Sequence, residues 1–364
     1  MSAYDAVLLV SFGGPEGPDD VMPFLRNVTR GRGIPDERLA VVAEHYHHFG
    51  GVSPLNGQCR ALLTELRPQL GLPVYWGNRN WAPYLRDTVA TMRDDGVRRA
   101  LAFVTSPFGS YSSCRQYLDD IAAARADVGP DAPEIDKVRH YHDHPGYVGP
   151  HASAVTAALA ELSAELSGSD RALSEADNVR LVFTAHSVPS TMDATSGPSG
   201  GRYTAQLRET AALVAGGREW DLVWQSRSGP PHQAWLSPDI NEHLAVLAAG
   251  GVRGVVVSPI GFSSDHLEVL WDLDVEAAAI AAKLGLRYAR AATPWGDPRF
   301  VAMVRDLILE RLDPARPQEK LGAVPVWDAC PVGCCHPGAR SSPSTTGSAA
   351  SPSRPADGLR LSGS

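Results

Sequence analysis

A histidine stands where an apolar run breaks off in "RLVFTAHSVPS", and this His186 can act as a metal ligand or as a proton acceptor. The carboxyl ends of strands in parallel sheets border the crevice in which ligands bind. A lone histidine in a turn is more often only hydrogen-bonded to its surroundings. The role of His186 therefore depends on which other reactive groups the chain brings to the same place.

Carboxylates are concentrated in "GFSSDHLEVLWDLDVEAAAI". On a helix, Asp265, Glu268, Asp272 and Glu276 are spaced i, i+3, i+7 and i+11, so they are predicted to line one stripe. For Glu276 a solvated face is the expected role. The start of this helix follows a strand and the turn "SPIGFSS", so its acids should face His186 across a pocket. Such a pair can bind a divalent metal or remove protons from a substrate.

Three of the five cysteines lie close together in "CPVGCC", at Cys330, Cys334 and Cys335. In a reducing cytosol this clustering indicates a metal site rather than disulfides. Structural zinc typically uses paired CxxC knuckles, whereas a 2Fe-2S cluster needs four thiolates. The candidates for a fourth ligand are Cys114, which follows a strand, Cys59, which is expected to be an inert thiol within a helix, and His336. Free thiols in a mobile tail are the alternative.

Strand-like runs alternate with amphipathic helical patterns twice along the chain, first in "DAVLLVSF", "LPVYWGN" and "ALAFVTSPF" and again in "VRLVFTAHS", "WDLVWQSRS" and "GVRGVVVSPIGF". The predicted fold class is α/β, with two Rossmann-like, doubly wound lobes and a cleft between them, followed by a short C-terminal extension. The expected boundaries are 1–145 and 146–315 for the lobes and 316–336 for the cysteine-bearing extension. Residues 337–364, rich in Ser, Pro, Gly and Ala, are expected to be a disordered tail.

Composition excludes several functional classes. The 364 residues include 33 Lys and Arg against 41 Asp and Glu, a formal charge of -8 without a basic stripe, which argues against a nucleic-acid partner. Neither a signal peptide nor a run of about 20 apolar residues is present, so a cytoplasmic protein without a transmembrane segment is expected. The turn "SFGGPEGPDD" fits no phosphate-binding spacing, and Pro15 and Pro18 remove amide donors from it.

Five segments, in order and at their separations, resemble the ferrochelatase family in its actinobacterial form: "VLLVSFGGPE", "VTRGRGIPDERL", "HFGGVSPLNG", "TAHSVP" and "GFSSDHLEVLWDLDVE". The resemblance extends from Met1 to about Arg311, which is effectively both lobes. It implies a lyase that inserts Fe(2+) into a porphyrin during haem biosynthesis. Bacteria of this kind typically use coproporphyrin III, which gives Fe-coproporphyrin III (coprohaem).

The resemblance also assigns roles to individual residues. His186 takes the part of metal ligand or proton acceptor, and Glu268 lies beside it as second ligand or base. Asp265 and Asp272 are then interpreted as a relay that moves protons or iron.

Substrate contacts are implied at five further positions. Arg30 and Arg32 are candidates for pairing with substrate propionates, and Ser53 and Tyr117 match substrate-contact positions of bacterial coproporphyrin enzymes. Phe12 departs from the pattern, because firmicute relatives place there a tyrosine that approaches the iron. A phenylalanine has no oxygen ligand, so Phe12 is expected only to pack against the macrocycle.

The resemblance also implies a 2Fe-2S cluster held by C-terminal cysteines and one cysteine of the catalytic body, for which Cys114 is favoured. The alternating histidines His140, His142 and His144 are interpreted as a polar crossover between the lobes, although they could bind metal. A monomer is expected, with transient contacts to neighbouring haem-pathway enzymes. The rival functions are a protoporphyrin IX ferrochelatase, a chelatase for another metal, and a non-enzymatic iron or haem sensor.

Overall fold

We analysed a computed structural model of the chain, which describes residues 4–167, 178–229, 232–331 and 333–335. The strands are β1 (Ala6–Ser11), β2 (Val74–Asn78), β3 (Arg99–Val104), β4 (Glu134–Lys137), β5 (Val179–His186), β6 (Trp220–Gln225), β7 (Gly254–Ser258) and β8 (Arg287–Arg290). The helices are α1 (Val21–Val28), α2 (Asp36–His48), α3 (Leu55–Leu66), α4 (Leu85–Asp94), α5 (Gln116–Val128), α6 (Pro145–Ser167), α7 (Ser190–Ala194), α8 (Arg202–Ala215), α9 (Ile240–Ala249), α10 (Leu267–Val269), α11 (Ala278–Lys283) and α12 (Pro298–Leu312). Two π-helical segments, η3 (Tyr111–Arg115) and η5 (Leu270–Ala277), precede α5 and α11.

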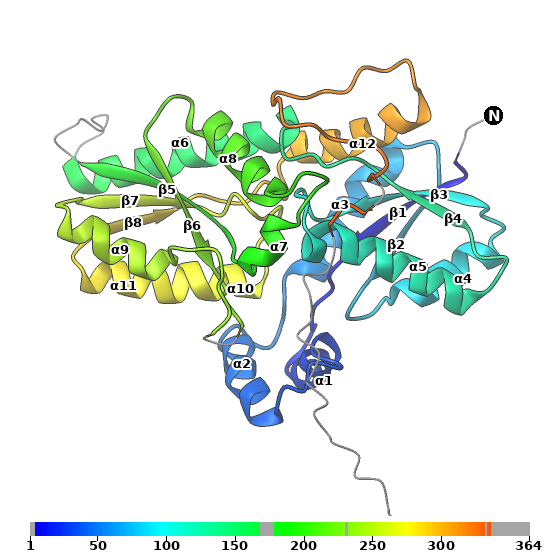
Figure 1. Cartoon of the computed structure of the whole chain (residues 1–364), viewed down its shortest axis with the longest axis horizontal. Coiled ribbons are helices and arrows are strands. Elements are labelled where there is room, and N and C mark those ends of the chain that lie inside the picture. Colours follow the sequence, from blue (N-terminus) through cyan, green and yellow to red (C-terminus); the bar gives the residue numbers. More distant parts are fainter. Residues whose placement is uncertain (1–3, 168–177, 230–231, 332, 336–364) are drawn as a thin grey trace, which may run out of the picture.

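The strands form two separate four-stranded sheets, which lie side by side in Figure 1. Their orders are β2-β1-β3-β4 and β6-β5-β7-β8, and every pairing is parallel. The two sheets therefore have the same strand order. In each sheet the second strand is added on one side of the first strand, β1 or β5, and the later strands are added on its other side. The predicted α/β fold with two doubly wound lobes is confirmed.

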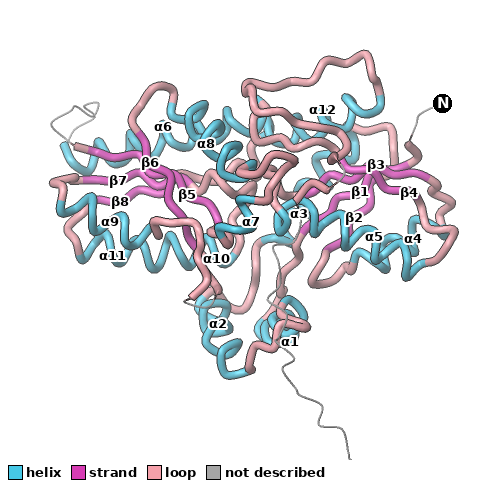
Figure 2. Tube along the Cα trace, viewed as in Figure 1, coloured by secondary structure: helices cyan, strands magenta, loops and turns pink. Residues whose placement is uncertain are grey.

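Helices cover both faces of each sheet (Figure 2), as continuous apolar strands require. All six residues of β1 are buried. Helices α4 and α5 cover one face of the first sheet, and α9, η5 and α11 cover one face of the second. The opposite faces of both sheets share a single buried cluster, to which α3, α6, α8 and α12 contribute.

This shared cluster joins the lobes. Phe300 of α12 lies edge-on to Phe103 of β3, with ring centroids 6.4 Å apart, while α12 also packs along α6. At the carboxyl ends of the strands, Ser263 donates a hydrogen bond to the carbonyl of Thr105 (2.9 Å), and Tyr147 donates to the carbonyl of Ile260 (2.8 Å). The loops after β3 and β7 are thereby held against each other.

A small helical hairpin, α1 and α2, is inserted between β1 and α3 and lies below both lobes in Figure 1. It has its own buried cluster around Phe24, Leu25 and Leu39, against which Phe12 packs. No helix in the described part of the chain is long and apolar enough to span a bilayer. The tail expected at 337–364 and His336 lie outside the described residues, and the lobe boundaries and the cleft stay predictions.

Close packing at Gly261 gives a first prediction. A Cβ at this position would lie 2.5 Å from the Cβ and 2.7 Å from the Cα of Ala185, the neighbour of His186. We expect Gly261→Ala to lower the free energy of unfolding by about 1–3 kcal/mol, since backbone must shift to make room. Thermal unfolding measures this loss, and Gly57→Ala, with nothing within 4 Å of its new Cβ, is the matched control. Equal stability of the two variants would contradict the proposed packing.

Candidate metal centre

His186 is the last residue of β5, at the point where the strand order of the second sheet reverses. Its Nδ1 lies 2.6 Å from the carbonyl oxygen of Ser187, which can only accept, so Nδ1 carries the proton and donates it. In the neutral ring Nε2 then has a free lone pair. The side chain is 34% exposed, so this nitrogen is accessible.

Glu268 approaches that free nitrogen. Its Oε2 lies 3.8 Å from His186 Nε2, and its side chain is 53% exposed. The glutamate belongs to α10, which follows the loop after β7, so both groups come from neighbouring strands of one lobe. An imidazole nitrogen and a carboxylate oxygen at this separation can share a divalent cation or a proton. The structure thus brings together the two residues that the sequence placed at the centre.

Asp265 is not part of the predicted carboxylate stripe. The helix begins at Leu267, with His266 in extended conformation before it, so Asp265 precedes the helix. Its two carboxylate oxygens accept hydrogen bonds from the two terminal nitrogens of Arg290, at 3.0 and 3.2 Å. The spacing argument also assumed a regular α-helix, whereas residues 270–277 are π-helical, which changes the angular step between side chains.

Asp272 lies in the π-helical segment and faces the end of β6. It accepts a hydrogen bond from Gln225 Nε2 (3.2 Å) and another from the hydroxyl of Ser226. Gln225 is paired with His186 in the sheet register. Burial is the largest cause that raises the pKa of Asp272, to about 6, and the charge of Glu268 raises it further. A carboxyl group with this pKa can exchange protons near neutral pH.

Helix α2 reaches across to the helix of Glu268. The ring of His45 stacks on Trp271 with centroids 3.9 Å apart and planes 9° apart. Burial is the largest cause that raises the pKa of the Tyr46 hydroxyl, and the negative charge of Glu268 raises this pKa further. Sequence reasoning missed His45, Tyr46 and Trp271, because nothing in the pattern indicated that α2 would pack on the other lobe.

Arg30 and Arg32 lie in the exposed turn after α1, with Gly31 and Gly33 at positive φ beside them. Neither guanidinium has an ion-pair or hydrogen-bond partner among the described residues, although their backbone amides close the turn. These two guanidinium groups lie on the α1–α2 hairpin, which packs against the helix of Glu268. Without a partner among the described residues, they suit an anionic ligand.

Phe12 and Tyr117 are brought together by a residue that the sequence did not single out. The guanidinium of Arg79 lies 4.3 Å from the ring centroid of Tyr117 and 5.7 Å from that of Phe12. Arg79 also forms an ion pair with Asp120, and only 6% of its side chain is exposed. Tyr117, in the first turn of α5, is buried in the core, and its ring packs against the guanidinium of Arg79.

Ser53 is buried beside the glycine-rich turn. Its amide donates to the carbonyl of Pro15 (2.8 Å), while its buried hydroxyl has no hydrogen-bond partner among the described residues. Gly14 is required here, because a Cβ would lie 2.5 Å from that of Ser53. The turn therefore presents one unsatisfied hydroxyl, which a bound polar group could satisfy.

The cysteines of the extension lie near Cys114. The thiol of Cys114 is the largest cause that lowers the pKa of the Cys330 thiol, to about 6. The sulfurs of Cys334 and Cys335 are 3.5 Å apart. No three described thiols have all their sulfurs within 4.8 Å of one another, as one ion would require. All five cysteines are free, and burial raises the pKa of Cys59, in α3, to about 11, as expected of an inert thiol.

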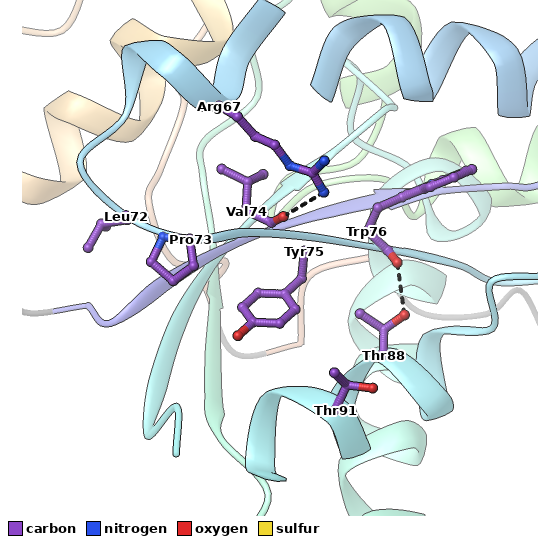
Figure 3. A pocket seen from close by; sticks show the side chains of 8 residues that line it. All are labelled: Arg67, Leu72, Pro73, Val74, Tyr75, Trp76, Thr88 and Thr91. Atoms are coloured by element: carbon purple, nitrogen blue, oxygen red, sulfur yellow. Dashed lines mark hydrogen bonds between the residues drawn. The ribbon is translucent and has the colours of Figure 1, made fainter. Parts of the chain in front are cut away.

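One pocket lies away from the His186 centre (Figure 3). It has a volume of about 680 Å³ and opens along the outer edge of β2, lined by Arg67, Leu72, Pro73, Val74, Tyr75, Trp76, Thr88 and Thr91. Arg67 and Thr88 donate to the carbonyls of Val74 and Trp76, so polar side chains already occupy part of this edge. None of the candidate site residues lines it.

The family follows from comparison with known proteins. The model of the ferrochelatase family matches residues 4–312, which spans both sheets and all residues of the His186 centre. The chain belongs to the ferrochelatase family.

Curated relatives agree with this membership. The chain is 54% identical over 327 residues to the coproporphyrin III ferrochelatase of Mycobacterium marinum, covering 89% of this chain and 92% of the relative. It is 52% identical over 362 residues to that of Streptomyces coelicolor, covering 92% and 94%. Among solved structures, SirB from Bacillus subtilis with Fe3+ has a TM-score of 0.51 at 11% identity, covering 86% of this chain and 98% of SirB. At this identity the likeness supports the fold alone.

The raised pKa of Asp272 predicts a pH-dependent stability. Because its folded pKa of about 6 lies above the ordinary 3.8, its contribution is present below about pH 3.8 and is lost as pH rises through about 6. Relative to Asp272→Asn, which cannot titrate, the parent should lose about 2 kcal/mol of stability between pH of about 4.5 and about 7.5. Urea unfolding of both proteins across this range measures the difference. A pH-independent difference would show that Asp272 titrates normally.

Proposed function

We propose that this chain inserts Fe(2+) into coproporphyrin III to form Fe-coproporphyrin III, with His186 and Glu268 as its reactive groups. The observation that supports this most directly is the Nε2 of His186, which lies 3.8 Å from the Glu268 carboxylate on a partly exposed side chain whose other nitrogen, Nδ1, is bound to the Ser187 carbonyl. Membership of the ferrochelatase family, and relatives in Mycobacterium and Streptomyces that are named coproporphyrin III ferrochelatases, support the reaction and the substrate.

Inserting a metal into a porphyrin requires that the cation lose its water and that two pyrrole N–H protons leave. In the proposed mechanism Glu268 and His186 Nε2 replace water ligands on Fe(2+). As the metal passes to the ring, the freed imidazole nitrogen and the freed Glu268 carboxylate each accept one of the two pyrrole protons. Asp272, with a pKa of about 6 and influenced by the Glu268 charge, takes protons onward to solvent. Asp265 is paired with Arg290, so we assign it no part beyond placing the start of α10.

The substrate side is proposed on the first lobe. Coproporphyrin III has four carboxylates, and the unpaired forks of Arg30 and Arg32 can bind them in a bidentate manner. The Ser53 hydroxyl supplies a further polar contact. Phe12 packs on the macrocycle. The guanidinium of Arg79, which lies against the rings of both Phe12 and Tyr117, supports the Phe12 ring. Remote contacts of this kind can hold a porphyrin in the bent geometry that metallation needs.

Substrate choice distinguishes the rival functions. Anaerobic incubation with Fe(2+) and either coproporphyrin III or protoporphyrin IX should show faster loss of the free-base spectrum for coproporphyrin III, because it offers more carboxylates to the arginines. Equal or faster use of protoporphyrin IX would overturn the substrate assignment. Binding of either porphyrin without turnover would favour a sensor, and preferential use of Co(2+) or Ni(2+) a different chelatase.

The two reactive groups can be tested separately from binding. His186→Ala and Glu268→Gln should each reduce metallation by about 10²-fold or more, the usual scale for a positioned acid or base, while porphyrin affinity stays within about two-fold. Fluorescence quenching measures the affinity, and the free-base spectrum measures turnover. His47→Ala and Glu65→Gln, both at exposed helical positions, are matched controls. Near-parental turnover of either active-centre variant refutes its role.

We also propose a 2Fe-2S cluster held by Cys114, Cys330, Cys334 and Cys335. Four thiolates bound in two pairs, one pair on each iron, are the ligand set of such a cluster. The contacts between Cys114 and Cys330 and between Cys334 and Cys335 suit that arrangement. When bound, the cluster supplies a redox-active, cross-linking group, and its reduced cysteines suit a cytoplasmic location.

The visible absorption of the purified protein tests the proposed 2Fe-2S cluster. Anaerobically purified protein should be brown, with about two irons and two sulfides per chain, and Cys114→Ser should bleach it as fully as Cys335→Ser. Cys59→Ser, at the buried thiol of α3, should keep the full visible spectrum. Loss of the cluster should also lower the melting temperature, because a ligand that binds only the folded state stabilises it. A colourless protein with stoichiometric zinc refutes the proposal.

A further inference from the structure

The histidine-rich crossover "HYHDHP" lies buried between the lobes and has polar groups that the proposed reaction does not use. His142 and Asp143 are fully buried. Neither oxygen of the Asp143 carboxylate accepts a hydrogen bond from the described residues, and Nδ1 of His142 is also without a partner. A buried carboxylate of this kind must be neutralised, paired or bound to a metal.

The crossover faces a carboxylate from another helix. Glu209 of α8 approaches His142 Nε2 at 3.0 Å, and ligand atoms of His142, Asp143 and Glu209 all lie within 4.8 Å of one another. The C-terminal segment covers them, since the amides of Ala323 and Val324 donate to Glu209. Gly322 is needed there, because any Cβ would collide with the Glu209 carboxylate.

The nearby arginine does not satisfy Asp143. Arg139 lies 3.7 Å from it, beyond hydrogen-bond distance, and four of the five N–H donors of Arg139 go to Glu310, at 2.8 and 3.0 Å, and to the backbone carbonyls of His140 and Glu319. Arg139 is thus bound mainly to Glu310, and among the described residues neither Asp143 nor Glu209 has an arginine within hydrogen-bond distance. A divalent cation between these two carboxylates would supply a positive charge to pair with them.

We infer that His142, Asp143 and Glu209 bind a divalent first-row cation of the Mn(2+), Fe(2+) or Zn(2+) class, separate from the His186 centre. One imidazole nitrogen and two carboxylate oxygens are the donors these ions prefer. The bound ion would join the interlobe crossover, α8 and the C-terminal segment. A second group, His144, Asp306 and Glu319, is a weaker candidate, because Asp306 is already paired with Arg305 and Arg316 and Glu319 is exposed.

Manganese binding tests the site, since Mn(2+) favours oxygen ligands over thiolates. In a His186→Ala background, which removes a ligand of the proposed catalytic centre, EPR titration counts bound Mn(2+). Adding Asp143→Asn should remove about one equivalent, since a neutral amide is a poor ligand for these ions. Adding Glu319→Gln should remove none. Equal binding with and without Asp143→Asn would overturn the inference and identify Asp143 as a buried neutral acid.

A measurement on the parent chain covers the case in which Asp143→Asn does not fold. Crystals of the full chain soaked in Mn(2+) should give an anomalous difference peak between the side chains of His142, Asp143 and Glu209. No peak there at a concentration that fills the His186 centre would equally overturn the inference. Neither result depends on porphyrin turnover, so the test is independent of the proposed reaction.

Discussion

The hydrogen bond from Ser263 to the carbonyl of Thr105 marks the contact on which the proposed active centre depends, because it holds the carboxyl end of one sheet against that of the other. The groups proposed for iron insertion, His186, Glu268 and Asp272, lie at the end of β5 or after β7, whereas the proposed substrate groups lie between β1 and α3, after β2 or on α5. The buried cluster shared by both sheets keeps these ends in register. Without that contact each lobe would present only half of the reactive groups.

Much of this arrangement was predictable from the sequence, because its signals are strong and local. Unbroken apolar runs such as that of β1 suit only strands buried on both faces, and their alternation with helices implies parallel sheets. His186 was predictable as a strand-end residue for the same reason. The pattern placed a carboxylate near the start of the following helix opposite His186, and the family resemblance assigned that role to Glu268, whose carboxylate lies 3.8 Å from the imidazole.

The rest depends on tertiary contacts and on departures from regular helix geometry. The carboxylate stripe assumed α-helical spacing from Asp265 onward, yet the helix begins at Leu267 and then widens into a π-helical segment. Cys114 also lies in a π-helical turn. No periodicity of apolar residues distinguishes such turns. His45 stacks on Trp271, and the guanidinium of Arg79 makes a cation–π contact with Phe12. Both contacts join segments far apart in sequence, so they became evident only in the folded chain.

The tautomer of His186 is fixed by the carbonyl of Ser187, the very next residue, rather than by a group across the lobe interface. Glu268 and Asp272 belong to the same lobe as the imidazole. Any hinge motion that admits a bulky macrocycle would therefore leave the metal-side groups assembled and move only the substrate-side groups relative to them. Opening and closing would then change how tightly the ring is bound, while the orientation of the imidazole stays constant throughout the cycle.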